Sequence, residues 1–64
     1  MNRAYARDNV NVRAGPSTQT DRVAQYHPGE CVNYDGEVYS EGRKWLTYTG
    51  KSGQRRYVAA EYFS

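Results

Sequence analysis

The sequence predicts a small all-β domain, built as a partly open barrel of five to six short antiparallel strands. Helical spacing of apolar residues is absent from the 64-residue chain, whereas short alternating segments recur roughly every 8–12 residues. Glycine and proline punctuate these segments. Isoleucine is absent, and seven Tyr and one Trp supply the apolar bulk that a few Val, Leu and Phe residues lack.

The first half of the chain is expected to supply three strands. Val10 and Val12 alternate with asparagines, which is typical of a strand with one apolar face. Gly and Pro interrupt the pattern after Ala14 and again after His27, so the strands are short. The expected strands cover residues 9–13, 23–26 and 31–34, and a polar loop covers residues 17–21.

The second half is expected to form two consecutive hairpins. Asp35-Gly36 bends the chain, residues 40–43 form the tip of the first hairpin, and the glycines of 50–53 turn the second. The expected strands cover residues 38–39, 45–48 and 55–58, and one short 3₁₀ turn covers 59–62. We expect residues 1–7 to form the N-terminal edge, with room for a first strand, and residues 8–64 to form the domain.

Alternation along each strand separates a buried face from an exposed one. Leu46 and Tyr48 share one face, and Trp45 lies on the other face, close to Tyr57 of the next strand. A solvent-facing Trp beside a Tyr is a patch that a loop, a second copy of the chain or an extended ligand would cover. The residues expected to point inward are Val10, Val12, Val32, Tyr34, Leu46, Tyr48 and Val58.

Catalytic and metal-binding patterns are missing. A single cysteine and a single histidine exclude an internal disulfide and a Cys/His structural zinc site. Cys31 and His27 flank a Pro-Gly turn that would splay them apart, and no third group is placed to orient the imidazole. Gly50-Lys51-Ser52 resembles the end of a phosphate-binding loop, but Trp45 stands where that motif requires glycine. We therefore expect no enzyme, no metal and no cofactor.

A net charge of +2 permits attraction to anionic polymers without requiring it. Small barrels that bind single-stranded nucleic acid combine stacking aromatics with a basic groove, and basic residues of the second half bracket Trp45 and Tyr57. Acidic residues are interspersed among them, so no stripe of one sign forms, and the sequence disfavours nucleic acid as a partner. No apolar run approaches the roughly 18 residues of a membrane span, so no membrane is expected.

Two segments resemble bacterial SH3 (SH3b) domains. Residues 9–17, Asn-Val-Asn-Val-Arg-Ala-Gly-Pro-Ser, resemble the opening strand and turn of that family. Residues 45–57, Trp-x-x-Tyr-Thr-Gly-x-Ser-Gly-Gln-Arg-x-Tyr, resemble the targeting domains of lysostaphin and of phage endolysins. The resemblance extends over about residues 8–63 and implies that the barrel is SH3-like.

The resemblance also implies a function. It indicates a non-catalytic cell-wall-binding domain that recognises Gram-positive peptidoglycan, through its peptide part, and targets a linked or associated peptidoglycan hydrolase such as a phage endolysin. A groove tyrosine of the family matches Tyr57, and the loop after Tyr34-Asp35 supplies the facing wall. Arg55 would bind a carboxylate of the wall peptide and Glu37 an amine. The expected contact residues are Trp45, Tyr57, Arg55, Tyr39, Glu37, Gly36 and Val38.

The sequence departs from the family pattern at two points, and two alternative functions stay open. Gly36 stands where the relatives are acidic, and the segment that completes their groove is expected to lie upstream of this chain. One alternative is a separately made assembly module that forms homo-oligomers or joins a longer enzyme chain through exposed aromatics and sheet edges. The lesser alternative is a small barrel that binds single-stranded nucleic acid. With no visible signal peptide, the chain is expected to be made in the cytoplasm of the bacterial host and to act at the cell wall during lysis.

Overall fold

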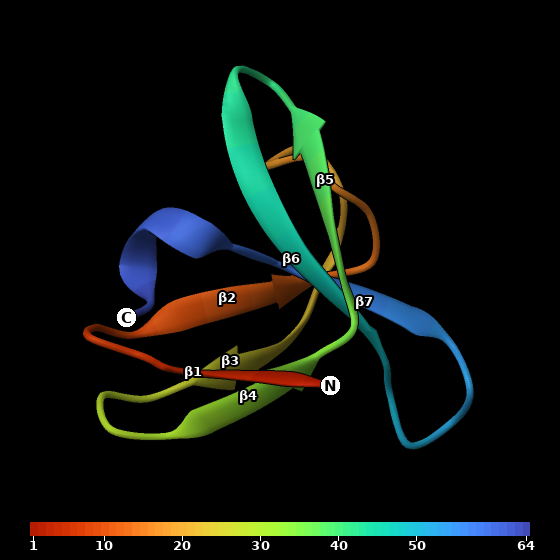
Figure 1. Cartoon of the computed structure of the whole chain (residues 1–64). Helices are drawn as coiled ribbons and strands as arrows, with labels where there is room; N and C mark the ends of the chain where they lie inside the picture. The colour runs from red at the N-terminus through yellow and green to blue at the C-terminus, as the bar shows by residue number, and fades with distance from the viewer.

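Seven strands follow one another along the chain, and a single 3₁₀ turn lies near the C-terminus (Figure 1). The computed structural model describes all 64 residues. No helix of the chain is long and apolar enough to cross a membrane. The elements are β1 (Asn2–Tyr5), β2 (Val10–Arg13), β3 (Arg22–Tyr26), β4 (Cys31–Tyr34), β5 (Gly36–Ser40), β6 (Arg43–Thr49), β7 (Arg55–Ala59) and η1 (Ala60–Tyr62).

The predicted all-β fold class is confirmed, with more strands than the five to six expected. The additional strand, β1, comes from residues with a weak sequence pattern, and β5 is longer than the strand expected over residues 38–39. β1 carries a single buried residue, Ala4, and β5 begins at Gly36 rather than at Val38. Asp35 is therefore the only residue between β4 and β5, and the chain passes almost directly from one strand into the next.

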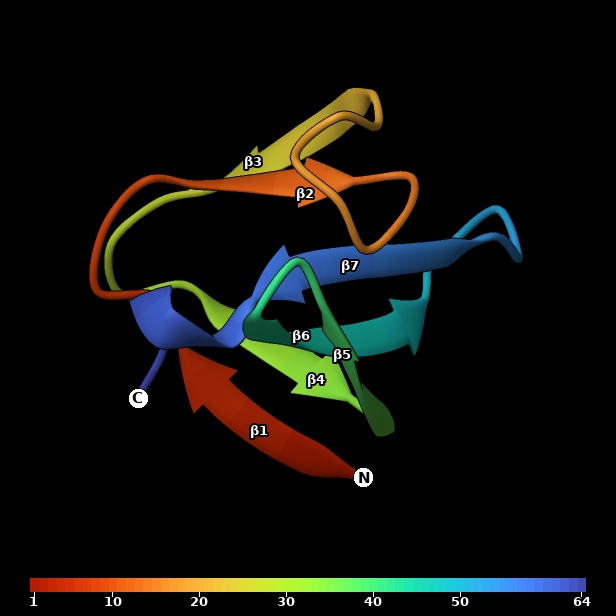
Figure 2. The same cartoon turned by 90° about the horizontal axis from the view of Figure 1, so that it is seen from above.

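The strands form two antiparallel sheets, one of order β1-β4 and one of order β3-β2-β7-β6-β5. Seen from above, β3 and β2 lie on one side of the molecule, β7, β6 and β5 in the middle, and β4 and β1 on the other side (Figure 2). β3 and β4 are consecutive, yet they do not pair, so the barrel is open between them. Elsewhere the chain ends close it, because the amide of Tyr5 donates to the carbonyl of Ser64 at 2.8 Å and the amide of Ser64 donates back at 3.0 Å.

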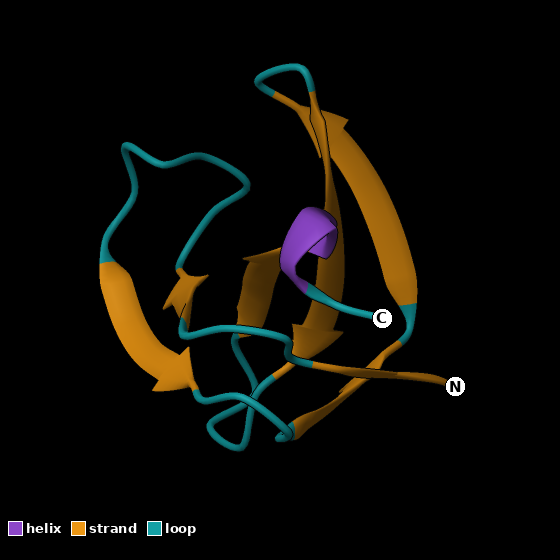
Figure 3. Ribbon diagram, turned by 90° about the vertical axis from the view of Figure 1, so that its left-hand side faces the viewer, coloured by secondary structure: helices purple, strands orange, loops and turns teal.

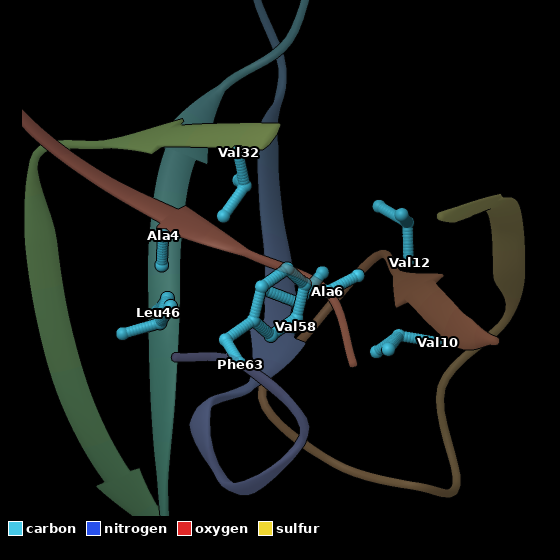
Figure 4. Close-up of a cluster of buried hydrophobic side chains, with 8 residues drawn as sticks. All are labelled: Ala4, Ala6, Val10, Val12, Val32, Leu46, Val58 and Phe63. Carbon is cyan, nitrogen blue, oxygen red and sulfur yellow. The ribbon is translucent and has the colours of Figure 1, made fainter. Parts of the chain in front are cut away.

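A dry core lies between the two sheets (Figure 4). Val32 and Val58 are completely buried, and Leu46 is 3 % exposed. The half-buried Tyr34 and Tyr48 pack against this cluster, so the predicted inward face is confirmed. Small alanines and a C-terminal phenylalanine, which alternation did not reveal, complete it. The eight core residues are Ala4, Ala6, Val10, Val12, Val32, Leu46, Val58 and Phe63.

The tip of the β5–β6 hairpin is a tight two-residue turn. Ser40 pairs with Arg43, so only Glu41 and Gly42 connect the strands. Both have positive φ, +58° for Glu41 and +70° for Gly42, which matches the turn geometry that suits the right-handed twist of hairpins. Glycine adopts this conformation freely, whereas Glu41 is held in it by contacts of its side chain with the loop between β2 and β3.

Candidate ligand-binding site

One side of the five-stranded sheet carries most of the residues predicted to contact a ligand. The strand register places Gly36, Thr47, Tyr57 and Arg13 in a row across β5, β6, β7 and β2. Cross-strand partners share a face, so this side is opposite to that of Leu46 and the core. We call it the Tyr57 face, and by register it consists of Arg13, Gly36, Val38, Trp45, Thr47, Thr49, Arg55, Tyr57 and Ala59.

Gly36 and Thr47 form the floor of the Tyr57 face. Thr47 is 5 % exposed, and its hydroxyl is buried without a hydrogen-bond partner. A Cβ atom at Gly36 would lie only 3.1 Å from Cγ2 of Thr47, so these two strands fit closely because residue 36 has no side chain. The half-buried side chains of Tyr57 and Arg13 stand beside this floor. The arrangement offers the ring of Tyr57 and the edge strand β5 to an extended ligand, while the guanidinium of Arg13 donates to the carbonyl of Thr20 at 2.9 Å.

Arg55 forms an ion pair at one end of this face. Its guanidinium donates to both carboxylate oxygens of Asp35, at 2.8 and 3.2 Å, and to the hydroxyl of Thr49 at 3.0 Å. The hydrogen bonds from Arg55 lower the pKa of Asp35, and those to Asp35 raise the pKa of Arg55. Arg55 was predicted to bind a ligand carboxylate, but the structure supplies that carboxylate from Asp35. Arg55 therefore braces the end of the face beside Tyr57.

Trp45 differs from its predicted environment. It lies on the predicted side of β6, yet it is only 2 % exposed, so the expected solvent-facing shelf of Trp45 and Tyr57 is wrong. Its indole N–H donates to the carbonyl of Ser40 at 3.0 Å, and the guanidinium of Arg43 lies 5.9 Å from the ring centroid. Trp45 instead lies in the lining of a hollow of about 290 Å³. Residues from β2, the loop that follows it, β6 and η1 line this hollow, and Figure 3 shows η1 beside β6.

Glu41 connects the hairpin tip to the loop between β2 and β3. Its carboxylate accepts a hydrogen bond from the hydroxyl of Ser17 at 2.6 Å and one from the amide of Thr18 at 2.9 Å. These two hydrogen bonds, the one from Ser17 first, lower the pKa of Glu41. Thr18 and Arg43 both line the Trp45 hollow, so this contact joins two segments that contribute to its lining.

The register separates Glu37 and Tyr39 from the other predicted contact residues. Gly36 and Val38 pair with Thr47 and Trp45, whereas Glu37 and Tyr39 pair with Leu46 and Lys44 and project to the opposite side of β5. Glu37 forms an ion pair with Lys44 at 3.5 Å, and Tyr39 is 78 % exposed. Residues 36–40 form a strand, where alternation applies, so the predicted contact residues of this segment lie on two sides of β5.

Cys31 and His27 each contact other residues. The thiol of Cys31 contacts the carbonyl of Val32 at 3.8 Å, while the Nδ1 atom of His27 lies 3.0 Å from the side-chain oxygen of Asn9. No three His, Cys, Asp or Glu side chains lie close enough together to hold a metal ion.

Several residues of this region have no local sequence signal. Arg13 joins the Tyr57 face only through the pairing of β2 with β7. Asp35 was read as a bend residue, and Glu41 as a hairpin tip. Both roles hold, but the hydrogen bonds of the two carboxylates depend on residues 20 and 24 positions away in the chain. Spacing within one strand carries no information about such partners.

Together, a small open barrel and a sheet face with a tyrosine at its centre place the chain among small β-barrel domains. The profile described as "Bacterial SH3 domain" matches residues 2–60, and the chain belongs to this family. The predicted resemblance to SH3b domains is thereby confirmed.

Sequence and structure comparisons identify relatives within larger proteins. "Probable autolysin PH" of Staphylococcus aureus is 41 % identical over 49 residues, which cover 77 % of this chain but only 10 % of the autolysin. The crystal structure of Ly7917 superposes with a TM-score of 0.83 at 37 % identity, covering 89 % of this chain and 25 % of that one. The SH3b domain of lysostaphin, in the P4-G5 complex, superposes with a TM-score of 0.84 at 28 % identity, covering 89 % and 62 %. The antimicrobial peptidase lysostaphin from Staphylococcus simulans gives a TM-score of 0.81, with this chain covering 24 % of its length.

Proposed function

We propose that this domain is a non-catalytic cell-wall-binding module that recognises the peptide part of Gram-positive peptidoglycan. The observation that carries the proposal is the Tyr57 face. A tyrosine ring and an arginine stand beside a floor formed by Gly36 and Thr47, at the start of the edge strand β5. An extended peptide laid there buries ring area against Tyr57 and meets hydrogen-bonding groups on both sides. Family membership supports the same assignment, since an SH3b domain is a binding module.

Tethering is the proposed mechanism. A module that holds a hydrolase on the wall converts each further encounter with substrate into a local event at high effective concentration. The tether requires no chemistry in this domain. We propose a peptidoglycan hydrolase as the linked or associated catalytic partner, because the autolysin and lysostaphin relatives are much longer than their matched segments.

The test is sedimentation of the tagged domain with purified Gram-positive peptidoglycan from which teichoic acid has been removed. We expect the domain to sediment with this material, and soluble wall peptides, but not isolated glycan strands, to release it. Sedimentation only when teichoic acid is present, or release by glycan strands alone, would contradict recognition of the peptide.

A second candidate function is assembly. Val23 on β3 is 42 % exposed and Tyr39 on β5 is 78 % exposed, and these two strands are the free edges of the five-stranded sheet. Edges of this kind pair with other chains. Sedimentation equilibrium distinguishes the two functions: a monomer at all concentrations that still binds peptidoglycan excludes assembly as the primary role.

A further inference from the structure

A second hollow lies at the open side of the barrel, away from Trp45. It has a volume of about 300 Å³ and lies where β3 and β4 fail to pair. Tyr26 of β3, Asn33 of β4, Tyr48 of β6 and Lys51 of the β6–β7 turn contribute to its lining. We call it the seam hollow. It shares no residue with the Trp45 hollow.

The seam hollow presents hydrogen-bond donors that have no acceptor in the protein. The hydroxyls of Tyr26 and Tyr48 lie 3.3 Å apart, and the one hydrogen bond between them uses one of their two protons, so the other proton has no protein acceptor. Burial, reinforced by Tyr26, raises the pKa of Tyr48, so this hydroxyl keeps its proton at physiological pH and remains a donor. The side-chain amide of Asn33 and the ammonium of Lys51 also form no hydrogen bond or ion pair within the chain.

The charges around the hollow favour a negative ligand. Asp35 is the one acidic residue in its lining, and both of its carboxylate oxygens already accept hydrogen bonds from Arg55. The charge of Lys51 is therefore uncompensated. A lysine ammonium and a phenol that both donate to one group match a carboxylate or a phosphodiester, whose oxygens only accept hydrogen bonds.

We propose that the seam hollow is a second ligand site, which binds an oxyanion of the carboxylate or phosphodiester class through Lys51, Tyr48 and Asn33. The site is separate from the Tyr57 face, because Tyr48 projects from the core side of β6 whereas Thr47 projects from the other side. The two sites meet only at Asp35 and Thr49, which Arg55 holds in place. Peptide carboxylates and the phosphodiesters of teichoic acid are the two wall components with this chemistry.

The first experiment uses small probes and no cell wall, so its result does not depend on the proposed function. The ¹⁵N-labelled domain is titrated with dimethyl phosphate and, separately, with sodium acetate, against sodium chloride at equal ionic strength. We expect saturable shifts of the amides of residues 31–35 and 48–51 with at least one probe and not with chloride. Lys51→Gln should weaken the binding of that probe by about tenfold, the loss expected of one charge-assisted hydrogen bond. Tyr48→Phe should weaken it as well while the ring remains packed.

Lys44→Gln is the matched control, because it removes the same charge from a lysine whose partner is Glu37, outside the hollow. Shifts of equal size with chloride, or equal losses in Lys44→Gln and Lys51→Gln, would overturn the proposal. Unchanged melting temperatures of the variants guard against misfolding. The stronger probe indicates the source: preference for dimethyl phosphate assigns a phosphodiester, and preference for acetate assigns a carboxylate.

A second experiment tests the source on the wall itself. Wild-type protein and Lys51→Gln are sedimented with walls that retain teichoic acid and with walls stripped of it. A loss confined to teichoic-acid-bearing walls supports the phosphodiester, and an equal loss on both supports the peptide carboxylate. Identical sedimentation of the two proteins on both walls would overturn a role for the seam hollow at the cell surface.

Discussion

The two sides of β6 and β7 are built from alternate residues of the same strands, yet they have opposite character. Leu46 and Val58 face the core, are nearly or completely buried, and contact only carbon-rich neighbours. Thr47 and Tyr57 face the other way, where one hydroxyl is buried without a partner and the ring is half-exposed beside Arg55. The side chains on the core side are packed against one another, whereas the Tyr57 side has an unpaired hydroxyl and exposed ring area. Stability and ligand binding should therefore respond to different substitutions within one pair of strands.

The largest effect is expected from Leu46→Ala on the core side. Truncation of a buried leucine costs roughly 2–5 kcal/mol, and a domain of this size has about 3–5 kcal/mol of folding free energy. The variant should be largely unfolded at 37 °C, which circular dichroism during thermal denaturation would reveal. A Leu46→Ala protein that melts like the parent would mean that the two sides have been assigned the wrong way round.

On the other side, Tyr57→Ala should leave the fold intact and impair binding. A contact at the centre of a binding surface is worth about 2 kcal/mol on truncation, which corresponds to a loss of about 30-fold in affinity for peptidoglycan. Tyr57→Phe separates the ring from the hydroxyl. The matched control is Tyr39→Ala, since Tyr39 is more exposed but projects from the opposite side of β5.

Affinity for purified peptidoglycan and melting temperature should be measured for all three tyrosine variants. Equal binding by Tyr57→Ala and the parent would show that the ligand lies elsewhere. Impaired binding by Tyr39→Ala would show that the ligand also contacts the opposite side of β5. Unfolding of Tyr57→Ala would place Tyr57 in the core and remove the distinction between the two sides.

Alternation predicted which residues of β2, β4, β6 and β7 face the core, because period-two patterning is a local property of each strand. It also placed Trp45 and Tyr57 on one side of the sheet. It could not predict that Trp45 is buried, because residues that line a hollow with it come from η1 and from a loop that is distant in sequence. Nor could it separate Glu37 from Gly36, since the strand character of β5 follows from pairing with β6 and not from its own composition.

Thr47→Val tests whether the unpaired hydroxyl on the Tyr57 side lowers the stability of the fold. Valine has nearly the shape of threonine, and it removes a buried hydroxyl that makes no hydrogen bond. Removal of an unsatisfied buried polar group should raise the free energy of unfolding by about 1 kcal/mol, the lower end of its desolvation penalty. Urea denaturation of the two proteins measures this difference. A destabilised Thr47→Val would indicate that the hydroxyl has a partner in solution and that the floor of the Tyr57 face is wetter than its burial suggests.

The smallest effect on stability is expected from substitution of Glu41, whose side chain joins the β5–β6 hairpin tip to the loop between β2 and β3. The hydrogen bonds from Ser17 and Thr18 depress the pKa of Glu41 in the folded protein below its ordinary value of 4.5. A group of this kind stabilises the fold above the pKa of the unfolded state, and the contribution is lost as pH falls through the lower folded pKa. Glu41→Gln keeps one acceptor oxygen, so its melting temperature at pH 7 should be only slightly below that of the parent.

The signature lies in the pH dependence of that difference. It should be constant from pH 7 to about pH 5 and shrink towards zero as the solution becomes more acidic, because a protonated Glu41 and the glutamine of the variant then offer similar groups to Ser17 and Thr18. Asp35, whose pKa is also lowered, is present in both proteins, so its titration cancels in the comparison. A difference that persists unchanged into acid would show that the shape of residue 41 at φ +58°, rather than its charge, holds the hairpin against the loop. The contact of Glu41 with Ser17 and Thr18 would then depend on packing, as the contacts on the core side do, and the two sides would not differ in this respect at the hairpin tip.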